Sequence, residues 1–239
     1  MHSTIAFSAL ALALSSSAFA APLNQVRQDP LTLADTVQFI AKTKGPNPNP
    51  GALPDLNNWL FKPIHSGAGQ NLGTLADPST TAPFNLSAAG YFRNGTDGPH
   101  SDGGYMTAGF LAGTTSTPPY SLSLAMSHDG TSPNPGALRG TVEFNAGVGT
   151  DGLDVPAGQL ITSNYVTDSF WACPDVPVEG GSAVAVEATN RYAATPTGCW
   201  AIALYAQCAG AISDVNRDAF PAFVQSRCYA DAASVVVAL

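Results

Sequence analysis

Residues 170–205, FWACPDVPVEGGSAVAVEATNRYAATPTGCWAIALY, carry the strongest structural signals in the chain. Val184 and Val186 alternate with small or charged residues, and Trp200 and Ile202 alternate with alanines. Alternation with a period of two predicts half-buried β-strands, and the Asn, Thr, Pro and Gly residues between the two patterns predict a turn region. The stretch therefore predicts two β-strands, and it contains no recognisable catalytic motif.

Similar patterns recur along the chain at intervals of roughly a dozen residues, which is typical of a β-sandwich or barrel. For the strand expected at residues 36–43, a helix beginning at Asp29–Pro30 is the alternative. Pro63 either limits the strand expected at residues 58–64 to a sheet edge or lies at the end of that strand. Residues 148–158 are expected to form a loop. The expected strands outside the opening stretch are 36–43, 58–64, 83–92, 105–111, 120–127, 141–144 and 235–237.

The order of these patterns predicts one all-β domain. No strand–helix–strand rhythm appears, so a parallel α/β sheet is disfavoured. We expect a single-domain antiparallel β-sandwich or barrel over residues 36–239, with at most a short helix near the C-terminal third, in residues 210–225. Residues 21–35 are polar at first and are expected to form an N-terminal arm.

Residues 1–20 have the features of a secretory signal peptide. The apolar run 5–14 is too short to cross a bilayer, and Ala18-Phe19-Ala20 is a cleavage motif. We therefore expect a secreted, extracellular protein that begins at Ala21. Asn85 and Asn94 each begin a glycosylation sequon, which makes a glycoprotein the expectation for an exported chain.

The charge of the chain bears on its partners. The net charge is −8, and the nine Lys and Arg residues are scattered. Without a basic patch, nucleic acid and anionic membrane surfaces are unlikely partners. No later stretch reaches the length of a transmembrane helix, so membrane insertion is not expected.

The four cysteines all lie in the last third of the chain. An even number in an exported chain predicts two disulfides, and three pairings are open. We favour the pairs that join neighbours in sequence, the first of which would link the strand of Trp171 to that of Trp200. A zinc site is the alternative, although the chain has no Cys-x-x-Cys pair. The favoured pairs are Cys173–Cys199 and Cys208–Cys228.

Several short motifs resemble a group of small secreted fungal proteins that carry a domain of unknown function. They are residues 39–43, followed by a Pro/Asn-rich loop, an aromatic strand that runs into His65-x-Gly67-Ala68-Gly69, Phe170-Trp171-x-Cys173, and Pro196-x-x-Cys199. A more distant resemblance is to fungal phialide and other cell-wall proteins. The likeness covers about residues 37–204 and implies secretion and wall association. It brings no catalytic residues, and the segment after Cys208 departs from both patterns.

Candidate chemistry is sparse. The chain has no Gly-x-Ser-x-Gly motif for a serine hydrolase. Histidines and aspartates in two loops would hold a divalent metal only if the loops met, and polar turn residues are the simpler interpretation. We therefore expect no cofactor and no metal. The residues that we single out as a candidate site are His65, Gly67, Gly69, His100, Asp102 and His128.

Carbohydrate chemistry is the other class that we consider. A glycoside hydrolase needs two carboxylates beside the scissile bond, but Glu143 and Glu187 fall on apparent solvent faces. Exposed aromatic residues would instead stack on sugar rings, although the candidates are better explained as core or sheet-face residues. They are Trp59, Trp171, Trp200 and Tyr205.

These observations favour a non-enzymatic fungal protein, outside the cell or at the cell wall, whose molecular activity the sequence does not reveal. Its expected partner is a cell-wall polysaccharide or another extracellular protein. The alternatives are a secreted hydrolase or carbohydrate-active enzyme, and an effector-like protein that binds a host component.

Overall fold

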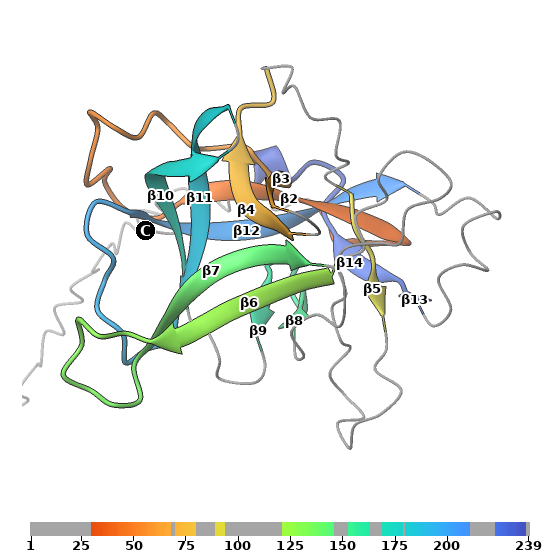
Figure 1. Ribbon diagram of the computed structural model, residues 1–239. Coiled ribbons are helices and arrows are strands. Elements are labelled where there is room, and N and C mark those ends of the chain that lie inside the picture. The colour runs from red at the N-terminus through yellow and green to blue at the C-terminus, as the bar shows by residue number, and fades with distance from the viewer. Residues whose placement is uncertain are drawn as a thin grey trace, which may run out of the picture.

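The computed structural model describes residues 30–67, 70–79, 89–93, 121–145, 153–162, 169–178, 180–210 and 223–237, and these residues form mainly antiparallel β-strands (Figure 1). The strands are β1 (Thr32–Ala34), β2 (Thr36–Thr43), β3 (Leu60–Gly67), β4 (Gln70–Ala76), β5 (Phe92–Arg93), β6 (Ser121–His128), β7 (Leu138–Asn145), β8 (Leu153–Asp154), β9 (Ile161–Thr162), β10 (Ser169–Val178), β11 (Gly181–Thr189), β12 (Trp200–Gly210), β13 (Phe223–Val224) and β14 (Ser226–Cys228). One short 3₁₀ helix, η1, covers Ala232–Ser234.

Eight of these strands form one sheet that closes on itself. Their order is β10-β12-β2-β3-β4-β11-β7-β6, and β10 also pairs with β11. The ring β10-β12-β2-β3-β4-β11 is therefore a closed barrel. β7 pairs with both β4 and β11, and β6 continues the sheet beyond it. The expected antiparallel all-β sandwich or barrel is confirmed.

The main hydrophobic core lies inside this sheet because alternate side chains of each strand point inward. The ring of Phe61 is central, with its centroid 6.5 Å from that of Phe39 and 5.3 Å from that of Phe144. Residues outside the long strands complete the core. They include the fully buried leucines Leu53, Leu56, Leu153 and Leu160.

A second, smaller apolar cluster covers the outer face of β2 and β12. Ile40 of β2 packs there against the C-terminal segment, and the ring of Tyr205 lies 6.1 Å from that of Tyr229. Lys42 is buried beneath this segment, and its Nζ donates hydrogen bonds to Asn58 Oδ1 at 2.7 Å and to the Ala233 carbonyl. Burial lowers the pKa of Lys42, although Asp231 and Asp55 act in the opposite direction.

Both favoured disulfides are present. Cys173 of β10 is bonded to Cys199, which directly precedes β12, so this bond crosslinks two neighbouring barrel strands. Cys208 at the end of β12 is bonded to Cys228 of β14. The second bond therefore ties the C-terminal segment to the barrel.

Several local expectations need correction. Residues 235–237 were expected to form a strand, but they follow η1 as irregular chain. Pro63 lies inside β3, opposite Gly73 of β4, and among the described residues β2 does not pair with β3 at this position, so the expected placement at a sheet edge is confirmed. Pro63 is tolerated because β2 pairs with β3 only near Leu60 and Phe61, so no neighbour on that side needs its missing N–H. The loop expected at residues 148–158 contains β8.

Two further features are the attachment of the N-terminal arm and the character of the helices. Within the expected N-terminal arm, residues 32–34 form β1 and pair with β14, so this part is attached to the body of the protein. Among the described residues, no helix has the length and apolar character needed to cross a membrane.

Candidate functional site

The outer face of β7, β11 and β10 is polar, in contrast to the covered face of β2 and β12. The register aligns Thr141 of β7 with Glu187 of β11, and Glu187 with Trp171 of β10. Arg139 lies opposite Thr189 and is therefore a diagonal neighbour of Glu187, within reach of a long side chain. Strand pairing alone thus gathers a cation, a carboxylate, hydroxyls and an indole on one face.

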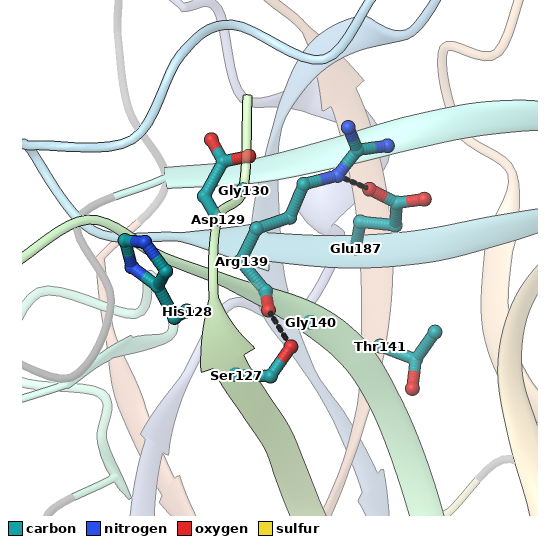
Figure 2. A pocket seen from close by; sticks show the side chains of 8 residues that line it. All are labelled: Ser127, His128, Asp129, Gly130, Arg139, Gly140, Thr141 and Glu187. Carbon is teal, nitrogen blue, oxygen red and sulfur yellow. Dashed lines mark hydrogen bonds and ion pairs between the residues drawn. The ribbon is translucent and has the colours of Figure 1, made fainter. Parts of the chain in front are cut away.

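A hollow of about 310 Å³ lies at one end of this face (Figure 2). This volume is at the low end of the range for small-molecule sites, about 300–1,000 Å³. The hollow is open to solvent because Ser127, His128 and Gly130 are exposed. Its lining residues are Ser127, His128, Asp129, Gly130, Arg139, Gly140, Thr141 and Glu187.

The ion pair between Arg139 and Glu187 fixes the floor of the hollow. Arg139 Nε donates to Glu187 Oε2 at 2.6 Å, and the two side chains are 33% and 16% exposed. The hydrogen bond that Arg139 donates to Glu187 raises the pKa of Arg139 above its usual value. Figure 2 shows the dashed contact at Nε, with one of the two terminal guanidinium nitrogens pointing away from the bonded carboxylate oxygen. The guanidinium group of Arg139 is therefore oriented by its Nε contact and presents hydrogen-bond donors at its terminal nitrogens.

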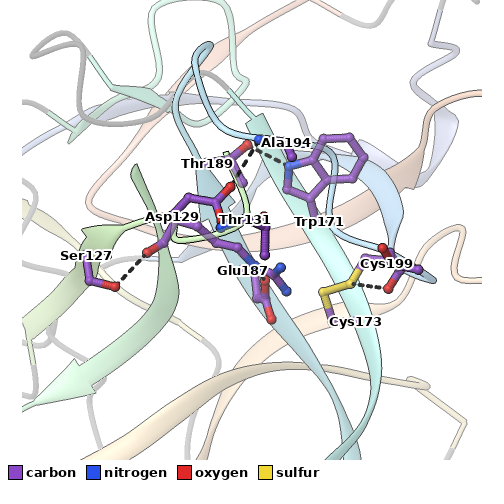
Figure 3. A network of polar contacts seen from close by, with 11 residues as sticks. Ser127, Asp129, Thr131, Trp171, Cys173, Glu187, Thr189, Ala194 and Cys199 are labelled. Carbon is purple, nitrogen blue, oxygen red and sulfur yellow. Dashed lines mark hydrogen bonds and ion pairs between the residues drawn. A yellow bond between two sulfur atoms is a disulfide. The ribbon is translucent and has the colours of Figure 1, made fainter. Parts of the chain in front are cut away.

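Asp129 links the two loops that border the hollow. Its carboxylate accepts hydrogen bonds from the Thr131 hydroxyl at 2.6 Å, from the Thr131 amide at 3.0 Å and from the Ala194 amide at 3.1 Å (Figure 3). The two bonds from Thr131 lower the pKa of Asp129, chiefly the one from the hydroxyl. His128 Nδ1 lies 3.2 Å from the Ala137 carbonyl of its own hairpin. These contacts hold the rim of the hollow in place.

Asn190 fastens the loop of residues 190–199 to the β6–β7 hairpin. Its Oδ1 accepts from the Leu138 amide at 3.0 Å, and its Nδ2 donates to the Gly136 carbonyl at 2.8 Å. The Ser132 hydroxyl donates to the Tyr192 carbonyl at 3.0 Å. The two loops are thereby joined by side-chain bonds at several points, which gives this end of the molecule a defined shape.

The Cys173–Cys199 disulfide lies beside Glu187 on the same outer face. The two sulfurs and a Glu187 carboxylate oxygen all lie within 4.8 Å of one another, a grouping that would suit a metal if the sulfurs were thiolates. Because they are bonded to each other, they do not serve as thiolate ligands. The group is a structural crosslink next to the hollow.

Comparison with models of protein families identifies the family of this chain. Residues 36–208 match the model of a domain of unknown function, DUF7907. The chain belongs to this family. The match begins at the first residue of β2 and ends at Cys208, so the DUF7907 domain holds the eight strands of the main sheet, except for the last two residues of β12, and every residue that lines the hollow. No curated protein and no solved structure shows a significant match to the chain.

The residues proposed from the sequence do not all meet at the hollow of the DUF7907 domain. His128 lines it, whereas His65 and Gly67 lie at the C-terminal end of β3. The register aligns His65 with Leu122 across β4 and β7, and His128 is six residues further along β6, about 20 Å at 3.3 Å per residue. Gly69, Asn85, Asn94, His100 and Asp102 lie outside the described residues, as do the expected signal peptide and the expected strand at 105–111.

One of the acidic expectations changes with the structure, whereas the aromatic ones do not. Glu187 was placed on a solvent face, but it is half-buried and held by Arg139. Trp200 is buried and its indole donates to the Lys44 and Gly45 carbonyls, each at 3.2 Å. Trp171, Trp59 and Tyr205 are half-buried, and Trp171 donates to the Thr189 hydroxyl at 2.8 Å. These four rings are explained by packing, as the sequence favoured.

Sequence reasoning missed Arg139 and Tyr192. Arg139 carries no motif, and only the pairing of β7 with β11 brings it to Glu187. Tyr192 lies in a turn-rich stretch that predicts a loop, and its exposure depends on how that loop is fastened to the hairpin. Arg139 is therefore recognisable only from strand register, and Tyr192 only from the contacts of its loop.

Proposed function

We propose that the chain is a secreted fungal protein that associates with the cell wall by binding a neutral, hydroxyl-rich polysaccharide without breaking it. The observation that carries the proposal is the hollow on the outer face of β7 and β11. It offers oriented donors and acceptors within hydrogen-bonding reach of one another, and its charged groups are already held by protein partners.

The chemistry of the carboxylates supports binding rather than hydrolysis. A glycoside hydrolase needs one carboxyl group that gives up a proton and a second that attacks or activates water. In the hollow, Glu187 is paired with Arg139, and Asp129 accepts three hydrogen bonds from the loops. Asp129 also has a lowered pKa, which is the opposite of what a general acid requires.

The charge of the site supports a neutral ligand. Asp129 and Glu187 carry two negative charges against the one positive charge of Arg139, and the whole chain has a net charge of −8. An acidic polymer would meet repulsion both at the hollow and over the surface. A sugar hydroxyl, in contrast, donates to a carboxylate and accepts from a guanidinium, and Thr141 and Ser127 add further hydroxyls.

Secretion and wall association rest on separate observations. Two disulfides lie in the fold, and such bonds persist in oxidising compartments. The N-terminal 20 residues have the pattern of a signal peptide, and the chain carries two sequons. The resemblance to secreted and wall-linked fungal proteins agrees with this location.

The test uses the purified mature protein with insoluble chitin, insoluble β-glucan and isolated fungal wall, and polygalacturonate beads as the acidic comparison. We expect retention on at least one neutral matrix and none on the acidic one, with no sugar released over a day. Sugar release that is lost in the Glu187→Gln variant would establish an enzyme and refute the proposal. Retention on the acidic matrix alone would also refute it.

A further inference from the structure

An exposed aromatic ring lies in the loop of residues 190–199, which is joined to the β6–β7 hairpin beside the hollow. Among the described residues, the exposed large apolar side chains include a single aromatic one, Tyr192, which is 46% exposed. The other three are aliphatic: Leu33, Ile161 and Val236. An exposed aromatic ring is the side chain most suited to stacking on a planar or pyranose face.

The backbone of Tyr192 is held on both sides. Its amide donates to Asn190 Oδ1 at 3.2 Å, and its carbonyl accepts from the Ser132 hydroxyl at 3.0 Å. One of these partners belongs to its own loop and the other to the β6–β7 hairpin. The position of the residue is therefore fixed by two elements rather than by a free loop tip.

The ring is also oriented. The Arg191 guanidinium carbon lies 4.9 Å from the ring centroid, and Arg191 Nη2 donates to the Tyr192 hydroxyl at 2.8 Å. On the hairpin side, a methyl group added to Gly136 would stand 3.7 Å from Tyr192 Cδ2, so the ring lies beside this glycine. A ring that is already oriented loses little conformational freedom when a ligand binds.

The same loop is connected to the hollow. The Ala194 amide, two residues beyond Tyr192, donates to the carboxylate of Asp129, which lines the hollow. We infer that Tyr192 is an aromatic platform that stacks on a sugar residue of a polysaccharide whose neighbouring residue occupies the hollow. This inference rests on the proposed function and names the contact that would hold the polymer outside the hollow.

The test measures the affinity of soluble β-1,3-glucan and of chitin hexasaccharide for four proteins: wild type, Tyr192→Ala, Tyr192→Trp and Leu33→Ala. Leu33 is the matched control because it is an exposed apolar residue of the separate β1–β14 pair. We expect Tyr192→Ala to weaken binding by about five- to ten-fold. Tyr192→Trp and Leu33→Ala should bind within about two-fold of wild type, and thermal unfolding should show that all four are folded.

The outcomes separate the two proposals. If wild type binds a neutral glycan and Tyr192→Ala binds it equally well, the platform is refuted while the proposed function stands. An equal loss in Leu33→Ala would also refute the platform, because the effect would not depend on the aromatic ring. If wild type binds neither glycan, the proposed function fails and the platform fails with it.

Discussion

Removing the Cys173–Cys199 disulfide should destabilise the fold by an amount that its loop length sets. The bond closes a loop with a sequence separation of 26 residues. In the chain-entropy model this restriction of the unfolded chain contributes about 3.5 kcal/mol at 25 °C. For a domain of this size, that corresponds to a fall of about 7–14 °C in Tm.

The variant is Cys173→Ala/Cys199→Ala, in which no free thiol remains. Alanine is preferred to serine because both cysteines are buried, at 4% and 6% exposure, and a hydroxyl there would need a new partner. Urea unfolding followed by tryptophan fluorescence measures the change directly, since Trp171 and Trp200 lie on the two strands that the bond connects.

The second disulfide is the matched comparison. Cys208–Cys228 has a sequence separation of 20 residues, for which the same model gives about 3.3 kcal/mol. The two alanine pairs should therefore lose similar free energy, because closure entropy depends only on the logarithm of loop length. A loss below about 1 kcal/mol for Cys173→Ala/Cys199→Ala would show that the strand pairing is already fixed in the unfolded chain and would refute the argument.

Two further predictions concern the framework of the hollow. Replacing Gly140 by alanine should lower the free energy of unfolding by about 1–3 kcal/mol or more, because the added methyl group would stand 1.9 Å from the Ala125 carbonyl oxygen. Gly51→Ala is the control, since that site has open space, and equal stability of the two variants would contradict the packing. Asp129 has a lowered pKa in the fold, so its stabilising effect is fully present above the unfolded value of about 3.9 and is lost as the pH falls through the folded value. Acid unfolding of Asp129→Asn should accordingly lack part of the wild-type pH dependence below about pH 4, and superimposable slopes would exclude this role.

The sequence predicted the fold well where one face of a strand is buried. The alternation of Leu122 and Leu124 with serines located β6, and the pattern around Val186 located β11. It failed at residues 235–237, where a β-branched run packs as irregular chain because Val235 joins the cluster over β2 and β12. The β-propensity of these three residues does not show that the neighbouring positions in the sheet are already occupied by other strands.

The site was less predictable for a related reason. Composition and motifs point to histidines and aspartates in loops, but the hollow depends on which strands pair. Arg139 and Glu187 are 48 residues apart and meet because β7 pairs with β11. Closure of the barrel through β10 and β11 sets that arrangement, and no short stretch of sequence encodes it.

The binding of a neutral glycan in the hollow is tested most directly by calorimetric titration of wild type and the Arg139→Met/Glu187→Met double variant with soluble β-1,3-glucan and chitin hexasaccharide. Replacing both partners avoids an unpaired charge, so stability should change by no more than about 1 kcal/mol. Wild type should bind at least one of these glycans, and the double variant should bind it about ten-fold or more weakly, as expected for the loss of a charged hydrogen bond. Equal affinity in the two proteins, or no binding by wild type, would contradict the assignment of the hollow as a glycan site.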